Sequence, residues 1–117
     1  MEDAKVNLII QQKTEDMILY GNQALKQFPK SERYAMAAEI KQSMYTFYRL
    51  IITANLKYYK KTTLQDADVE LEVLRGFLKL AATKELRYLP LSKYENWSKM
   101  VNEIGRMLGG WIKAMKQ

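Results

Sequence analysis

The chain has 117 residues, with 19 Lys and Arg against 13 Asp and Glu, and its formal net charge is +6 at neutral pH. It has no His and no Cys, which excludes Ser-His-Asp and Cys-His nucleophiles, imidazole proton shuttles and the usual thiolate or imidazole metal sites. Any catalysis would depend on carboxylates, Lys or Tyr, so an enzyme is the least favoured class, and we expect no cofactor. This length predicts one domain, and the 48% hydrophobic content with only 2 Pro favours a helical fold with short loops.

The first twelve residues are ambiguous, because Val6, Leu8 and Ile10 alternate with other residues. They fit either a short extended arm or an added helical turn, and we favour an arm over residues 1–12 before a domain over 13–117. Glu2 and Asp3 stand where a signal peptide needs basic residues. No apolar run approaches the roughly 18 residues of a spanning helix, so we expect a soluble, cytoplasmic protein with no membrane contact.

Helical spacing of apolar residues predicts four amphipathic helices in the remainder of the chain. We expect the first over residues 14–28, the second over 31–59, the third from 62 or 63 to about 81, and the fourth from 92 to 115. The predicted N-terminal caps are Thr14, Ser31, Thr62 or Thr63, and Ser92 in a capping box with Glu95. The predicted buried positions are Met17, Gly21, Ala24, Leu25, Phe28, Ala37, Ile40, Met44, Phe47, Tyr48, Ile51, Ile52, Leu64, Ala67, Leu71, Leu74, Leu78, Ala81, Trp97, Met100, Val101, Ile104, Leu108, Trp111, Ile112 and Met115. Four such helices with short connections predict an all-α, up-down-up-down four-helix bundle.

Three glycines interrupt the fourth helical pattern, at Gly105, Gly109 and Gly110, just before Trp111. Each costs about 1 kcal/mol relative to Ala in a helix interior. Gly105 and Gly109 share a helix face, so another backbone could approach closely there. Helix packing within the protomer, a helix end at Gly109, and a contact between subunits all fit this pattern.

The positive charge is unevenly distributed along the chain. Residues 41–61 hold five basic residues and no acid, residues 62–72 hold Asp66, Asp68, Glu70 and Glu72 before any further base, and residues 73–117 hold nine basic residues against three acids. Helix dipoles account for part of this polarity. The excess in the last segment predicts either a solvated basic face or a surface for a polyanion.

Two other groups of residues allow more than one interpretation. Tyr residues concentrate at 45–59, where Tyr58 and Tyr59 precede Lys60 and Lys61; this pattern suits a subunit interface or core, and also base stacking on single strands. The acids of residues 66–72 have Mg²⁺-compatible spacing but no matching carboxylate helix, so we expect no metal site.

The sequence EIGRMLGGWIK at residues 103–113 resembles the closing helix of the accessory variability determinant (Avd) family, the helper proteins of diversity-generating retroelements. The resemblance extends through FPKSERY at residues 28–34 and ADVELEVLR at residues 67–75, and covers nearly the whole chain from about residue 13. The wider superfamily includes the four-helix bundles encoded in intervening sequences of 23S ribosomal RNA genes, whose Asn-Ile-Ala-Glu-Gly signature is missing here.

The resemblance implies a non-catalytic, positively charged protein that assembles into a barrel-like homopentamer. It implies that the protein binds RNA or DNA and the reverse transcriptase of the same element. Basic residues of the third helix are implicated in these contacts, and the matching positions here are Arg75 and Lys79. The full set predicted to bind nucleic acid or transcriptase is Arg75, Lys79, Arg87, Lys60, Lys61 and Arg106, and the set predicted for oligomer contacts or close helix packing is Gly105, Gly109, Gly110 and Trp111.

The alternative is a structural or protein-interaction bundle of the intervening-sequence type, whose basic surface meets an acidic protein.

Overall fold

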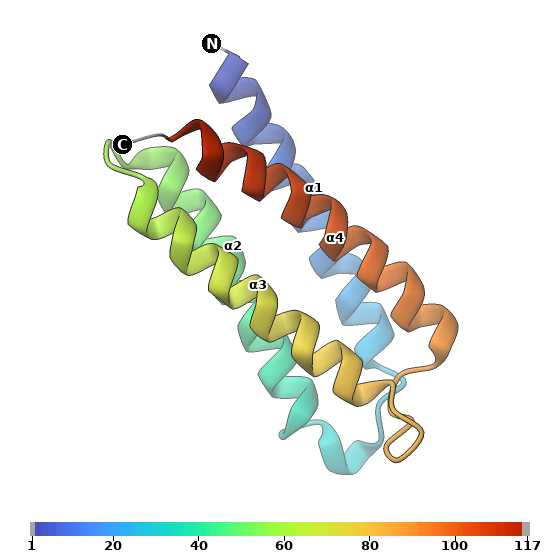
Figure 1. Ribbon diagram of the computed structural model, residues 1–117. Helices are drawn as coiled ribbons and strands as arrows, with labels where there is room; N and C mark the ends of the chain where they lie inside the picture. Colours follow the sequence, from blue (N-terminus) through green and yellow to red (C-terminus); the bar gives the residue numbers. More distant parts are fainter. Residues whose placement is uncertain (1, 116–117) are drawn as a thin grey trace.

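The computed structural model describes the backbone of residues 2–115 and the side chains of residues 7–115. Within this part the α-helices are α1 (Glu2–Leu25), α2 (Met36–Leu56), α3 (Lys61–Ala81) and α4 (Leu91–Ala114), with the 3₁₀ turn η1 (Lys30–Glu32) between α1 and α2. The helices run alternately up and down in a bundle of 44 × 23 × 20 Å, so that α1 begins and α4 ends at the same end (Figure 1). The predicted all-α four-helix bundle is confirmed. None of the described helices is long and apolar enough to cross a membrane.

The core lies between the predicted apolar stripes. Each helix packs against two neighbours, α1 and α3 each contacting α2 and α4. The stripe of α3 is fully buried, as predicted, at Leu64, Ala67, Leu71, Leu74, Leu78 and Ala81. From α4, the fully buried Trp97 packs against α1, and its indole donates the Nε1 hydrogen to Met17 Sδ at 3.3 Å. Trp97 also explains Gly21 on α1, because a Cβ there would lie 2.5 Å from Trp97 Cζ2 and 2.7 Å from Met44 Sδ.

The predicted extended arm is wrong for residues 2–12, because α1 begins at Glu2 and continues through this segment. Ile10 is fully buried, and it lies on the same helical stripe as Thr14 and Met17. Thr14 is therefore an interior residue and not a cap. Its hydroxyl donates to the carbonyl oxygen of Ile10 at 2.8 Å, which satisfies this polar group inside the core. Residue 1 lies outside the described part.

The other predicted caps are wrong as well. α2 begins only at Met36, after η1, and Glu32 rather than Ser31 supplies a side-chain acceptor, its Oε1 taking the Met36 backbone hydrogen at 3.2 Å. Lys60 precedes α3, and Pro90 precedes α4; neither helix has a side-chain cap bond at its start. Thr62, Thr63 and Ser92 thus lie inside the first turns of α3 and α4, and Glu95 follows the first turn of α4.

Candidate nucleic-acid and assembly surfaces

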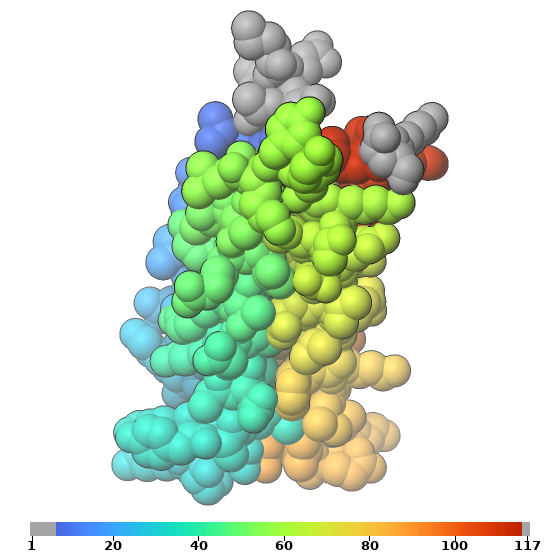
Figure 2. Space-filling view, turned by 90° about the vertical axis from the view of Figure 1, so that its left-hand side faces the viewer, coloured from blue at the N-terminus to red at the C-terminus, as the bar shows by residue number. Residues whose placement is uncertain are grey.

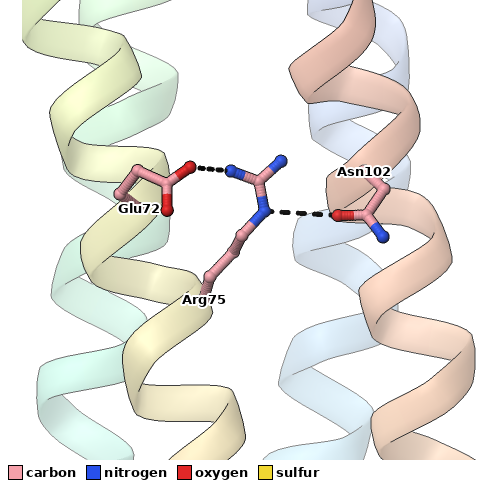
Figure 3. A network of polar contacts seen from close by, with 3 residues as sticks. All are labelled: Glu72, Arg75 and Asn102. Carbon is pink, nitrogen blue, oxygen red and sulfur yellow. Dashed lines mark hydrogen bonds and ion pairs between the residues drawn. The ribbon is translucent and has the colours of Figure 1, made fainter.

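Arg75 is tied into the bundle rather than free on its surface. Its guanidinium pairs with Glu72 one turn earlier on α3, and its Nε donates to Asn102 Oδ1 of α4 at 3.2 Å (Figure 3). The same guanidinium lies over Gly105, where a Cβ would collide with Nη2. Arg75 thus connects α3 to α4, and only part of its charge faces solvent, since its side chain is 32% exposed.

Lys79 lies one turn beyond Arg75 on the same face of α3, as the spacing predicted. Both line a hollow of about 220 Å³ between α3 and α4, together with Leu78, Tyr94, Ser98, Val101 and Asn102. Lys79 is exposed and has no hydrogen bond or ion pair within the described residues. This hollow therefore presents one cation that is available to a ligand and one that is held by Glu72.

The remaining predicted binding residues do not join this hollow. Lys60 lies in the turn between α2 and α3. Its Nζ donates to the carbonyl oxygens of Ala54 at 2.6 Å and Lys57 at 2.5 Å, so it satisfies acceptors at the C-terminal end of α2. Lys61 begins α3 beside it. Arg87 lies in the loop at the other end, at φ 52°, with its Nε donating to the Lys84 carbonyl oxygen at 3.2 Å. Arg106 is exposed on α4. The predicted residues are thus spread over both ends and the middle of the bundle.

The glycines of α4 differ in what surrounds them. Gly105 meets the Arg75 side chain, so its close packing is within the protomer. Gly109 and Gly110 are exposed, and a Cβ at either position would meet no described atom within 4 Å, while the helix continues through them to Ala114. A helix end at Gly109 is therefore wrong. Trp111 packs in the core with 6% exposed, and its Nε1 has no hydrogen-bond partner among the described residues.

A cationic cavity that the sequence did not single out lies at the end of the bundle away from the start of α1. It has a volume of about 370 Å³, and the end of α1, η1 and the start of α2 surround it. Its lining residues are Asn22, Leu25, Lys26, Phe28, Pro29, Lys30, Arg33, Ala37 and Lys41. The four cations are exposed, and no acid is among the lining residues. The linear sequence did not reveal this cluster, because its cations come from separate segments and residues 1–40 hold six acidic residues against five basic ones.

Apolar side chains are exposed on two different faces. Three neighbouring open hollows lie on the outer surface of α1 and α2, one of them on α2 alone, and they are lined in part by the exposed residues Leu8, Leu19, Tyr45 and Leu56. On α3, the outward-facing residues Val69, Val73 and Leu80 are exposed at helical spacing, with the open surface of Gly76 among them. Figure 2 shows α2 between these faces, flanked by α1 in blue and α3 in yellow.

The tyrosines divide between structural and exposed positions. Tyr48 donates its hydroxyl hydrogen to Glu15 Oε2 at 2.6 Å, and this bond, with desolvation and the nearby negative charge, raises the Tyr48 pKa above its usual 10.0. Tyr58 and Tyr59 are 86% and 81% exposed and form an edge-to-face pair with ring centroids 4.7 Å apart. This aromatic pair thus projects into solvent at the α2–α3 turn.

Two of the four acids of α3 have partners within the bundle, whereas Asp66 and Asp68 are exposed. Glu70 Oε2 accepts the hydroxyl hydrogen of Ser43 at 2.7 Å, and Glu72 is held by Arg75. In the part of the chain that the structure describes, no group of three or more acids is placed to hold a metal ion.

Comparison with known proteins identifies the family. Residues 8–115 match the family described as bAvd-like. No curated protein matches the chain. Because the family match covers nearly the whole bundle, the chain belongs to the bAvd-like family and is an Avd-type accessory protein.

Proposed function

We propose that this chain is the non-catalytic accessory subunit of a diversity-generating retroelement, which binds nucleic acid and the reverse transcriptase of the element as a ring-shaped homo-oligomer. The observation that carries the proposal is the bAvd-like family match over residues 8–115. The net charge of +6 supports it, because a basic surface attracts polyanions and the charge is multiplied in an oligomer.

The two exposed apolar faces support self-assembly into a ring. A closed ring of more than two identical subunits with one kind of contact uses two different surfaces of each subunit, whereas a two-fold dimer uses one surface twice. The α1–α2 face and the outward face of α3 are two such surfaces, and exposed apolar patches of this kind mark protein contacts. The number five comes from the family resemblance alone.

Complementation between two variants tests the ring. Leu19→Glu places a charge on the α1–α2 face, and Val73→Glu places one on the face of α3. Each variant alone should remain monomeric in light scattering, while an equimolar mixture should form heterodimers, because each partner retains one intact surface. The exposed residue Asn96 of α4, which lies on neither face, provides a control as Asn96→Glu, which should leave the oligomer intact. If the mixture stays monomeric while each variant is folded, these two surfaces do not form the ring contact.

A pulldown with the reverse transcriptase encoded beside this gene tests the partnership. The transcriptase should co-purify with the tagged accessory protein, and nuclease treatment separates a direct protein contact from one bridged by RNA. Absence of the transcriptase from both pulldowns would show that the partnership is wrong.

A further inference from the structure

The cationic cavity at the α1–η1–α2 end has the composition of an anion site. Lys26, Lys30, Arg33 and Lys41 approach it from three consecutive segments of the chain. None of the four forms a hydrogen bond or ion pair through its side chain within the described residues. Four like charges around one small cavity repel one another, and a bound anion would remove that repulsion.

The segment FPKSERY, residues 28–34, builds much of this cavity and divides into two kinds of residues. Phe28 is buried and packs against Tyr88 with ring centroids 5.7 Å apart, and Glu32 accepts the first backbone hydrogen of α2. These residues have structural roles. Lys30 and Arg33 alternate with them, line the cavity and are exposed. Packing and capping therefore explain Phe28 and Glu32 but not the two cations.

The walls of the cavity favour a nucleotide over a simple anion. Leu25, Phe28 and Ala37 are buried and give it an apolar wall, against which a planar base can lie, while the cations stand at its exposed rim. The volume of about 370 Å³ falls within the usual range of ligand sites. Tyr34, next to Arg33, exposes 87% of its surface and offers a ring on which a neighbouring base can stack.

We infer that this cavity binds one nucleotide of a single-stranded nucleic acid, with its backbone phosphates on Lys26, Lys30, Arg33 and Lys41 and its base against the apolar wall. The inference rests on the proposed nucleic-acid binding and places its principal contact at this end of the bundle, away from Arg75. Arg33 can hold a phosphate through two parallel hydrogen bonds, which Lys cannot do.

The test compares two double variants that each remove two positive charges. Lys30→Gln with Arg33→Gln alters the cavity, and Lys84→Gln with Lys99→Gln is the matched control at exposed positions outside it. The full-length protein is titrated with a fluorescent single-stranded RNA at several salt concentrations, and circular dichroism checks that both variants are folded. The cavity variant should lower the salt-dependence slope by about 1.4 for each cavity that the RNA occupies, since each phosphate contact on a single strand contributes about 0.7. For one occupied cavity, and with equal affinities of the variant and the wild type at 1 M salt, a slope lower by about 1.4 makes the affinity of the variant about 25-fold lower at 0.1 M salt. The control should retain the wild-type slope.

The outcomes separate this inference from the proposed function. If the wild-type protein does not bind RNA, the proposed nucleic-acid function is wrong. If it binds and the cavity variant has the same affinity and slope, only the site is wrong. Lys30→Arg with Arg33→Lys retains both charges and should restore most of the slope. Poly-glutamate of equal charge should compete weakly; if it displaces the RNA at equal concentration and loses affinity in the same variant, the cavity takes an acidic protein and the inference is overturned.

Discussion

Arg75 has a structural role that its position in a basic segment did not reveal. Its bonds to Glu72 and Asn102 tie α3 to α4. Arg75→Gln should therefore lower the free energy of unfolding by about 1 kcal/mol, the usual size of a partly exposed charge-assisted contact. Lys79→Gln, four residues away, removes the same charge without a partner and should change it by less than about 0.5 kcal/mol. Urea unfolding of the two variants makes the comparison, and equal stabilities would contradict the role of Arg75.

Tyr48 makes the protein sensitive to alkaline pH. Its pKa is raised in the folded protein, chiefly by the hydrogen bond to Glu15, so the stabilisation from this bond is fully present below pH 10.0 and is lost as pH rises through the raised pKa. Tyrosinate absorbance during a pH titration should show a late-ionising tyrosine that disappears in Tyr48→Phe. The pKa of Tyr88 is also raised, by burial and by the nearby Glu32, so Tyr88 should still ionise late in that variant. An unchanged titration curve for Tyr48→Phe would contradict this assignment.

At the scale of the helix, glycines with different surroundings should respond differently to a methyl group. Gly21→Ala should lower the free energy of unfolding by about 1–3 kcal/mol, because the new Cβ meets the Trp97 ring in a packed core. Gly109→Ala should raise it by up to about 1 kcal/mol, because its surroundings in the protomer are open and Ala favours helix. Thermal or urea unfolding of dilute protein checks both signs. A stabilising Gly21→Ala would show that α1 and α4 do not approach as closely as described.

The helices could be predicted from the sequence wherever one apolar stripe dominates, as in α3 from Leu64 to Ala81. The start of α1 could not, because Thr14 is a polar residue at a core position and concealed the stripe that includes Ile10. The predictions of the helix caps were wrong for a related reason. The residue types that cap helices are present, but tertiary contacts decide which of them accept or donate at the helix ends. Glu32 and Lys60 satisfy the ends of α2, while Ser31 and Thr62 do not cap a helix.

The candidate sites were less predictable than the helices, because they depend on which segments meet. Arg75 and Lys79 could be placed together from their spacing on one helix. The hydrogen bond from Arg75 to Asn102 could not be predicted, because it joins residues from different helices. The same holds for the cavity around Lys30 and Lys41, which three segments form together.

In the whole molecule, the cations of the cavity and the exposed apolar residues lie on different parts of the surface. The cations around the cavity occupy one end of the bundle, and the exposed apolar residues lie along the sides of α1–α2 and α3. Side-to-side assembly through these faces would leave the ends of the bundles accessible and would repeat the cationic cavity around the symmetry axis. A nucleic acid could then contact several cavities at once, which increases its affinity without a new kind of contact.

The proposed accessory function is tested most directly by cDNA synthesis by the reverse transcriptase of the same element on its template RNA, with and without this protein. We expect full-length cDNA to require the wild-type accessory protein, and Lys30→Gln with Arg33→Gln to lower the cDNA yield at physiological salt, whereas Lys84→Gln with Lys99→Gln should not. A cDNA yield that is the same with and without the wild-type protein would show that this chain is not an accessory subunit of the transcriptase.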